Sequence, residues 1–494
     1  MEPEIHAARA LRARLLADAH RPLYHVVTPE GVCAPFDPNG ALFWNGRYHL
    51  HTIVQTEKGH CWDHISSHDL VHWRHHGLSL EPGGVDEGIF SGGAFIDKDG
   101  VPTITYWGLG ESAGICLATS TDPDLAVWTK SPANPLIPQT SLGIHEDGHG
   151  LVYGAADPSA IWIHEGRYYM LTGNLLVLRA YGIERDLDEH KGDTAYLFVS
   201  DDLVRWDYLG PFYTSRREWT RADEDDMCPD FFSLGERYML LFISHNLGCQ
   251  YYLGHYEGER FLPETHGRMT WIDNAFFAPE SLLDDRGRRL MWAWVFDGRE
   301  PATREASGWS GTLSLPRVLW LGEDHTLRMA PPEELALLRM HPKAYHDLMV
   351  PADREVGLEA VQGNSLELVV EMVVGAAAEA GVKVCCSPDG AEATRITYDA
   401  VEKKLKVDTT RSSLGEGPKV VEAGPFELGA GEPLRLHIFI DRSIVEVFAN
   451  DRQAVTRCIY PTQPDSLGVS LFSTGGAVEA PSVQAWEMAA ANPW

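Results

Sequence analysis

Short stretches in which apolar and aromatic residues alternate with polar ones recur along the first two thirds of the chain. Examples are "GALFWNGRYHLHTIV", "SGGAFIDKDGVPTITYWG" and "PSAIWIHEGRYYMLTG". Alternation with a period of two is typical of strands that bury one face, and the intervening "NG", "KDG" and "EG" tolerate the positive φ of tight hairpins. The pattern predicts a long series of antiparallel hairpins.

A motif that recurs along the chain indicates how these hairpins are arranged. The letters "SHDL" followed by Trp73 reappear as "SDDL" followed by Trp206, and in looser form as Ser120, Asp122 and Trp128. Self-similar strand units of this size are typical of propeller blades. We expect each Asp to cap a turn and each Trp to pack between adjacent sheets.

The hairpin rhythm lapses near residue 339 and gives way to longer alternating strands such as "SLELVVEMVV" and "LRLHIFIDRSIVEVFA". Such alternation fits a sandwich in which each sheet buries one face. We therefore expect an all-β protein with a propeller over 22–338, a linker over 339–351 and a β-sandwich over 352–494. Residues 1–21 interleave charges with Ala and Leu at helical spacing, which predicts a short N-terminal surface helix.

Composition and charge limit the kinds of ligand. The chain has 494 residues, enough for at least two cores, and its 71 acidic against 41 basic residues give a formal net charge of −30. Such a field repels nucleic acid and anionic membranes, so we expect neither as a partner. A small-molecule or oligosaccharide substrate that is neutral fits best, since no Lys/Arg cluster indicates a phosphate pocket.

Targeting and metal signals are weak. No apolar run is long enough for a membrane span or a signal peptide, which favours a cytoplasmic enzyme, with secretion from a trimmed precursor as the alternative. The eight cysteines lack metal-site spacing, and free thiols are expected. The spacing of His145, Asp147 and His149 suits a metal, but no further ligand lies nearby, so a polar loop is favoured and no metal or cofactor is predicted.

Six ordered motifs carry a resemblance to a known family. They are "FDPNG", "FSGGAFID", "ADPSAIW", "CPDFF", "GWSGTLSLPR" and "IFIDRSIVEVFANDRQAVT". In this order they resemble glycoside hydrolase family 32, the invertase, inulinase and levanase family, from about Arg21 onward. The resemblance implies a five-bladed propeller with a funnel-shaped active site, followed by a β-sandwich. It also implies retaining hydrolysis of β-fructofuranosides without a metal.

The resemblance assigns two carboxylates. The family's nucleophilic Asp falls on Asp37, where the "DPNG" letters match while Ala34, Pro35 and Phe36 replace the residues before them. A family Asp that holds sugar hydroxyls in the transition state falls on Asp157, preceded here by Ala rather than the family's Arg. By themselves, "DPNG" and "DPSA" are ordinary turn sequences.

The proton donor departs from the family pattern. Met227 stands where the family has the Glu of its Glu-Cys-Pro motif, and methionine carries no proton. Asp226, one residue away in an acidic run, is one candidate, although adjacent strand residues point to opposite faces unless a bulge re-aims them. Glu280, near the family's leaving-group side, is the second candidate. A structural role for each is equally consistent with the sequence.

The resemblance also implies contacts to the sugar and between the domains. Candidate sugar-binding residues are Asn39, Gln55, Trp62, Phe90, Ser91 and Asp273, the last resembling an Asp that bonds near the acid/base. In the second domain, "DRS" from Asp441 and the following Glu446 match a family signature with no catalytic task, and we expect them to organise a turn and the domain interface.

Two other functions compete with a fructofuranosidase. Arabinofuranosidase-type propellers use a similar trio of carboxylates but lack the appended sandwich signature. The second alternative follows from Met227: a carbohydrate-binding propeller that has lost turnover. An enzyme loses turnover when Asp37 becomes Asn, whereas a binding protein has affinity and no turnover in either form.

Overall fold

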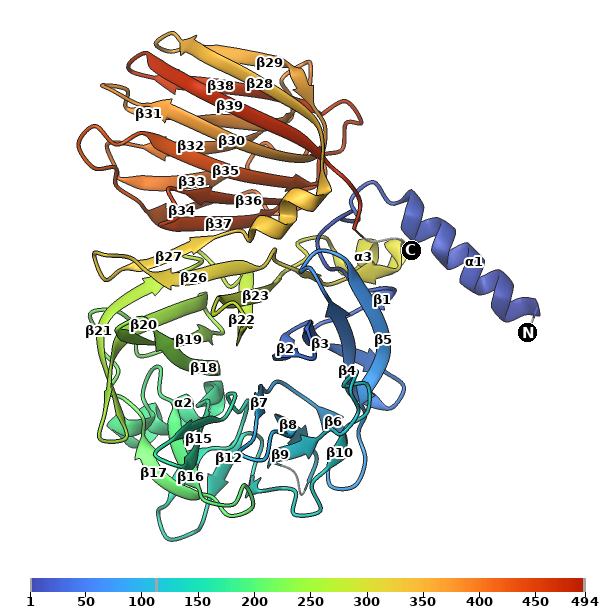
Figure 1. Ribbon diagram of the computed structural model, residues 1–494, viewed down its shortest axis with the longest axis vertical. Coiled ribbons are helices and arrows are strands. Elements are labelled where there is room, and N and C mark those ends of the chain that lie inside the picture. Colours follow the sequence, from blue (N-terminus) through green and yellow to red (C-terminus); the bar gives the residue numbers. More distant parts are fainter. Residues whose placement is uncertain (1, 112–113, 492–494) are drawn as a thin grey trace.

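The computed structural model describes residues 2–111 and 114–491. Two all-β bodies lie side by side in Figure 1, a propeller built from the first two thirds of the chain and a sandwich of two sheets built from the rest. The predicted fold class is confirmed.

Five antiparallel sheets form the propeller and surround a central axis (Figure 1). The first consists of β2 (Pro38–Trp44), β3 (Arg47–Thr56), β4 (Gly59–Ser67) and β5 (Trp73–Leu80). The second consists of β6 (Gly88–Ile89), β7 (Ala94–Ile96), β8 (Pro102–Leu109), β9 (Gly114–Thr119), β10 (Thr129–Lys130) and β11 (Ile137–Pro138). The third consists of β14 (Trp162–His164), β15 (Arg167–Thr172), β16 (Tyr196–Ser200) and β17 (Asp207–Pro211).

The last two sheets complete the ring next to the sandwich. The fourth consists of β18 (Met227–Leu234), β19 (Arg237–Ser244), β20 (Gly248–Glu257) and β21 (Arg260–Arg268). The fifth consists of β22 (Phe276–Leu283), β23 (Arg289–Val295), β25 (Thr312–Leu313), β26 (Arg317–Leu321) and β27 (Leu327–Ala330). Two small pairs lie outside these sheets: β1 (Gly31–Val32) with β24 (Trp309–Ser310), and β12 (Ile144–Glu146) with β13 (Val152–Gly154).

The repeated motif has the structural role that its sequence predicts. Asp69 Oδ1 accepts hydrogen bonds from two backbone N–H groups of its turn, and Asp202 Oδ1 does the same in the third sheet. Trp73 packs edge-on against Trp292, at a ring distance of 6.1 Å, between the first and fifth sheets. Local side-chain to backbone bonds of this kind favour turns over continued strands, so the motif ends one strand and starts the next.

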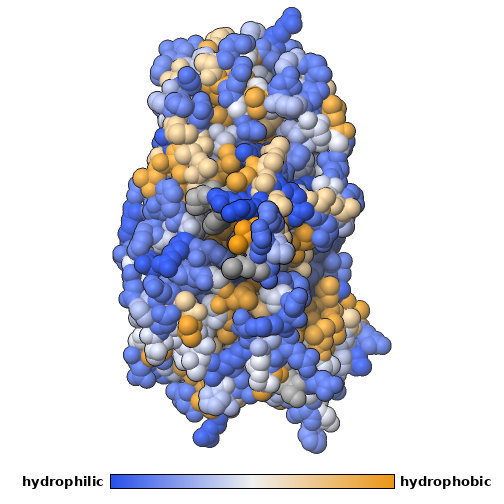
Figure 2. Space-filling view, turned by 90° about the vertical axis from the view of Figure 1, so that its right-hand side faces the viewer, coloured by the Kyte–Doolittle hydropathy of each residue, from blue (hydrophilic) through white to orange (hydrophobic). Residues whose placement is uncertain are grey.

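Helices are few and lie outside the sheets. α1 (Glu2–Ala17) projects away from both bodies (Figure 1) and buries only Leu15, so the helix expected over 1–21 is present but shorter. The others are α2 (Leu175–Arg185), α3 (Pro301–Ser307) and the 3₁₀ turns Asp188–His190 and Glu333–Leu338. Among the described residues, no helix combines the length and apolar character of a membrane span. The face in Figure 2 is mostly hydrophilic, with apolar residues in small scattered groups.

The sandwich packs two six-stranded sheets around one apolar core. One sheet has the order β28 (Arg339–Val350), β39 (Val478–Met488), β30 (Ser365–Val373), β35 (Leu434–Asp441), β36 (Ile444–Ala449) and β37 (Gln453–Cys458). The other has the order β29 (Glu355–Gln362), β38 (Gly468–Thr474), β31 (Glu379–Cys386), β32 (Thr394–Asp399), β33 (Lys404–Asp408) and β34 (Val421–Pro425).

The expectation of a linker over 339–351 is wrong, because residues 339–350 form a strand. β28 occupies almost all of that range and pairs with β39 at the edge of its sheet, so the sandwich begins at Arg339 rather than at 352. Most of β28 is exposed, and it carries Pro342, Lys343 and a register shift after Met340. Charges, proline and bulges protect sheet edges from pairing with other chains. They also remove the alternation by which a strand is recognised in sequence.

The two bodies share a buried polar interface. Asp441 accepts hydrogen bonds from the backbone of residues 23–25 and from His25 Nδ1, at 2.9 Å for the imidazole. His25 Nε2 lies 3.2 Å from Glu446, which also pairs with Arg317 of the propeller at 3.3 Å. The Asp441 and Glu446 signature therefore organises the domain interface, as expected. The two carboxylates raise the pKa of fully buried His25 to about 9, against the opposing effect of burial.

Candidate active site

The inner ends of four propeller sheets share an unusual backbone conformation. Gly40, Asp157, Cys228 and Ala278 all have positive φ, between 38° and 51°. In β2, β18 and β22 this residue lies within a register shift, where extra residues bulge from the pairing with the next strand. Bulges re-aim side chains, and non-glycine residues at positive φ are costly and concentrate at functional sites. The conformation marks one end of the propeller axis as the candidate site.

Asp37 and Asp157 come together at this end. Asp37 Oδ2 accepts a hydrogen bond of 2.7 Å from the Ser91 hydroxyl, and Asp157 Oδ2 lies 3.5 Å from the Cys228 thiol. The two side chains are 5% and 6% exposed. Their Oδ1 atoms are buried and have no hydrogen-bond partner among the described residues. Since buried polar atoms are normally paired, two unpaired carboxyl oxygens mark this end of the axis as a candidate ligand site.

The two carboxyl groups have different proton affinities. Burial raises the pKa of Asp37 to about 6, opposed by the Ser91 hydrogen bond and the positive charge of His245. Burial raises the pKa of Asp157 to about 7, and the negative charge of Asp37 adds to the rise. The charge of Asp37 is thus a cause of the raised pKa of Asp157, so ionisation of one group disfavours ionisation of the other.

Four of the predicted sugar-binding residues surround this pair, mostly as its support. Ser91 contacts the nucleophile candidate directly. The buried Asn39 amide donates to the Asp37 carbonyl at 2.8 Å and accepts from the Gly92 backbone N–H at 3.0 Å. Trp62 is fully buried and donates to the Phe90 carbonyl at 3.1 Å, while the Phe90 ring is half-buried. Trp62 therefore positions Phe90. The full burial of Trp62 argues against the prediction that its own ring stacks on a sugar.

Gln55 and Asp273 lie apart from the pair. The exposed Gln55 amide donates to the next residue's carbonyl at the end of β3. Asp273 forms a 2.9 Å ion pair with Arg457 of the sandwich. Its carboxylate thus serves the domain interface, which corrects the expectation that it bonds near the acid/base.

Asp226 is not placed beside the carboxylate pair. Its carboxyl group is fully buried and accepts a hydrogen bond of 2.8 Å from Tyr213, a residue of the apolar cluster between the third and fourth sheets. Burial and the nearby Asp193 hold its pKa well above the usual range. β18 begins one residue later, at Met227, so its bulge does not include Asp226. This placement argues against Asp226 as the proton donor.

Glu280 is likewise separated from the pair. Its carboxyl group is buried and accepts a 3.0 Å hydrogen bond from the Ala41 backbone. Asp230 adds to the effect of burial in raising its pKa, whereas Arg289 opposes the rise. Asp230 and Arg289 line a cavity of about 370 Å³ together with later residues of the inner strands, such as Phe232 and Leu282. Glu280 marks the residue at which the register of β22 resumes, and its carboxyl group is engaged by the Ala41 backbone.

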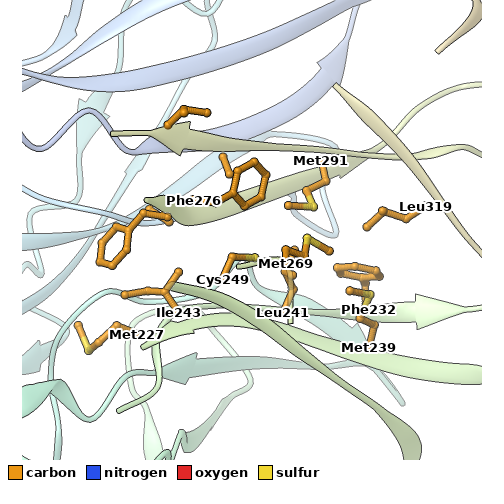
Figure 3. Close-up of a cluster of buried hydrophobic side chains, with 14 of the residues drawn as sticks. Met227, Phe232, Met239, Leu241, Ile243, Cys249, Met269, Phe276, Met291 and Leu319 are labelled. Atoms are coloured by element: carbon orange, nitrogen blue, oxygen red, sulfur yellow. The ribbon is translucent and has the colours of Figure 1, made fainter. Parts of the chain in front are cut away.

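Met227 is excluded from the funnel by packing. It is 1% exposed and belongs to the apolar cluster of Figure 3, where it lies at the end nearest Ile243. The backbone N–H of Leu175, the first residue of α2, lies 2.9 Å from its sulfur. Helix α2 therefore covers the position at which the family carries its acid. A position covered in this way accommodates an apolar side chain such as that of Met227.

A histidine that the sequence reasoning missed adjoins the pair. His245 follows β19 at the same end of the propeller, and its Nδ1 lies 2.6 Å from Asp225 Oδ2. The charge of His245 acts on both Asp37 and Asp157. Two features of the sequence could have indicated His245: its position directly after a strand, in "FISHN", and the presence of Asp225 in the acidic run before Met227.

The loop singled out for metal spacing is a turn. Asp147 accepts hydrogen bonds from the backbone N–H groups of His149 and Leu151, and His145 Nδ1 lies 3.1 Å from the Pro138 carbonyl. Within 2–111 and 114–491, no cluster of three potential metal ligands was found.

Comparisons with known proteins agree with this architecture. The model of the glycosyl hydrolases family 32 N-terminal domain matches residues 25–331, and that of the family's C-terminal domain matches 334–487. A sucrose-6-phosphate hydrolase of Zymomonas mobilis is 28% identical over 517 residues, covering 97% of this chain and 94% of the relative. A levanase of Bacillus subtilis is 28% identical over 510 residues, covering 94% and 70%.

Among solved structures, fructan 1-exohydrolase IIa from Cichorium intybus superimposes with a TM-score of 0.81 at 22% identity. The match covers 96% of this chain and 98% of that one, and it supports the five-bladed propeller with its appended sandwich. With both family models matched in order and across nearly the whole chain, this protein belongs to glycosyl hydrolases family 32, whose members are retaining hydrolases of β-fructofuranosides.

Proposed function

We propose that this enzyme hydrolyses neutral β-fructofuranosides with Asp37 as nucleophile and Asp157 as the group that holds the sugar. The buried carboxyl pair carries the proposal, because each member has one oxygen engaged by a protein donor and one oxygen unpaired. A single donor engages one oxygen of each carboxyl group, and the other oxygen is left for the substrate. Retaining glycosidases use such a carboxylate to form a covalent glycosyl-enzyme intermediate.

Asp157 suits a second role. Its higher pKa, about 7, and its position beside Asp37 make it a partner that shares hydrogen bonds with sugar hydroxyls. As positive charge develops on the fructosyl ring in the transition state, a carboxylate nearby stabilises that charge. The Arg that precedes this Asp in the family is Ala156 here, and it is fully buried, so that residue supplies no cationic contact.

The charges around the pair favour a neutral substrate. Among the described residues, the leading charged partners of Asp37 and Asp157 are His245, Asp225 and the pair itself, with the Cys228 thiol bonded to Asp157, and no Lys or Arg stands among these partners. Recognition of a phosphate ordinarily uses Arg or Lys. Sucrose and fructo-oligosaccharides therefore fit better than the phosphorylated sugar for which the Zymomonas relative is named.

The test is fructose release from sucrose, sucrose 6-phosphate, an inulin-type and a levan-type fructan, together with arabinose release from an aryl arabinofuranoside. The wild type and Asp37→Asn are compared, and the anomeric configuration of the first product is followed by NMR in the presence of methanol. We expect fructose from a neutral fructoside, retention of configuration, and loss of release in Asp37→Asn.

Other outcomes select the alternatives. Release from sucrose 6-phosphate alone would contradict the neutral-substrate assignment, and arabinose release would favour the arabinofuranosidase-type activity. Sugar binding without turnover in both proteins would favour a carbohydrate-binding propeller. Unchanged turnover in Asp37→Asn would remove the nucleophile from the proposal.

A further inference from the structure

Besides the nucleophile, retaining hydrolysis requires a group that gives a proton to the departing oxygen and later takes one from water. The structure removes the three positions at which the sequence places that group. Met227 is apolar and covered, the Asp226 carboxyl group is bonded to Tyr213 inside the sheets, and Glu280 lies with Asp230 and Arg289. The donor must therefore come from another part of the wall around Asp37.

His245 is positioned by four contacts. Asp225 Oδ1 accepts its backbone N–H at 2.8 Å, and Asp225 Oδ2 accepts from its Nδ1 at 2.6 Å. The Asn274 amide donates to its backbone carbonyl at 2.9 Å, and its ring stands edge-on to Phe277 at 5.5 Å. These contacts fix both the backbone and the plane of the imidazole. They leave Nε2 with no hydrogen-bond partner among the described residues, on a side chain that is 34% exposed.

The surroundings of His245 favour its protonated form. Burial alone lowers its pKa, but the hydrogen bond and charge of Asp225 raise it, and the charges of Asp157 and Asp37 add to the rise. The net shift is upward from the ordinary value. Besides the carboxyl groups, the Cys228 thiol adjoins this site. Burial, Asp157 and Asp37 hold its pKa well above the usual range, so it stays neutral.

The contact with Asp225 orients the imidazole of His245. A carboxylate that holds Nδ1–H fixes the tautomer, so that Nε2 is the atom that gives or takes a proton. Asp225 is fully buried and contacts His245 through both oxygens, whereas its sequence neighbour Asp226 points the other way. In the segment that leads into β18, Asp225 thus holds His245 while Asp226 bonds to Tyr213.

We propose that His245, oriented by Asp225, is the general acid and base of this enzyme, in place of the carboxylic acid that Met227 replaces. The proposal rests on the function proposed above. In the first step Asp37 attacks the anomeric carbon, the glycosidic C–O bond breaks, and the departing oxygen takes the Nε2 proton. The products are a fructosyl ester of Asp37, the free alcohol and a neutral imidazole.

Water completes the cycle. Its oxygen attacks the anomeric carbon of the ester, neutral Nε2 takes a water proton, and the bond to Asp37 breaks. Fructose leaves, Asp37 is again a carboxylate, and His245 is again an imidazolium. The proton on Nδ1 stays between His245 and Asp225 throughout, so charge and protons balance over the two steps.

The experiment compares two leaving groups. His245→Gln is assayed on sucrose and on an aryl β-fructofuranoside whose phenolate leaves without protonation. General acid catalysis is typically worth about 10²–10⁴-fold, so kcat/KM for sucrose should fall by about that factor. The first step with the aryl substrate should change by less than about tenfold, and the alkaline limb of the pH profile should disappear.

Asp225→Asn and Asp226→Asn form a matched pair of adjacent substitutions. Asp225→Asn removes the charge that favours imidazolium, so the alkaline limb should move to lower pH. Asp226→Asn should leave that limb in place, and circular dichroism checks that both variants are folded. Equal losses on both substrates in folded His245→Gln, or unchanged sucrose hydrolysis, would overturn the proposal. A wild type inactive on every fructoside would instead overturn the proposed function.

Discussion

The raised pKa of Asp37 implies that the active site reduces the stability of the fold. The folded protein holds this proton with a pKa of about 6, against an ordinary value of 3.8. Because the folded state binds the proton more tightly, stability falls as the pH rises through this window and stays lower above it. The shift of about 2 pKa units corresponds to about 3 kcal/mol at neutral pH. Asp37→Asn removes this cost together with the charge.

The comparison of two pH values isolates the electrostatic effect. At about pH 7.5 the full 3 kcal/mol applies, and at about pH 4.5 linkage leaves about 1 kcal/mol. The stability of Asp37→Asn relative to wild type should therefore improve by about 2 kcal/mol between these conditions. Any fixed cost of an unpaired buried amide cancels in the difference. Loss of charge at Asp37 relieves Asp157 and deprives His245 of a partner, so these secondary effects oppose each other.

Urea denaturation followed by tryptophan fluorescence measures this quantity, because 13 of the 15 tryptophans precede residue 339 and report on the propeller. Asp285→Asn, the same change at an exposed turn position, is the control and should show no comparable pH dependence. If the stability difference between Asp37→Asn and wild type is the same at both pH values, burial does not raise the pKa of Asp37 in the folded protein.

Three further predictions follow from single contacts. Ser91→Ala removes a donor to Asp37, so the acid limb of kcat/KM should move to higher pH in a pH–rate profile; a limb that stays in place or moves down would contradict this. Met227→Glu should lower the free energy of unfolding by about 1–3 kcal/mol without raising activity, because its carboxyl group is buried under α2, whereas Met227→Leu should cost less. His25→Gln should remove about 3 kcal/mol of stability that is fully present below pH 6.5 and is lost as the pH rises through about 9. Unfolding measured at pH 6 and above pH 9 should show a large deficit only at the lower pH.

Period and turn chemistry predict the fold well. Alternation and the Asp-capped turns give hairpins, and the recurrence of Trp73 and Trp206 gives sheets packed around an axis. The edge strand β28 was missed because its residues are mostly exposed and include charges and a proline, as sheet edges often do. The alternation of apolar and polar residues that marks a strand with one buried face is therefore absent. Local patterns therefore locate strands that bury a face and overlook strands that do not.

The candidate site is harder to predict because it is made of residues at bulges. A one-residue change of register reverses the face on which a side chain lies, and the shift in β18 falls between Met227 and Asp230. Asp225 and Asp226 are adjacent in sequence, yet one holds His245 and the other binds Tyr213. Motif matching assigns Asp37 and Asp157 by letter, but it has no means of deciding which of two neighbouring acids points toward them.

Met227, α2 and His245 are best understood as one change in the wall of the site. An acid at position 227 needs solvent or hydrogen-bond partners, and the start of α2 at Leu175 removes both by covering that position. Once the position is covered, methionine packs with Ile243 at no electrostatic cost (Figure 3). The turn that follows Ile243 then carries His245 beside Asp37. Met227 pairs with Ile243 at the open end of the β18–β19 hairpin, and His245 follows two residues later, so the loss of one proton donor and the gain of another are linked by a single strand pair.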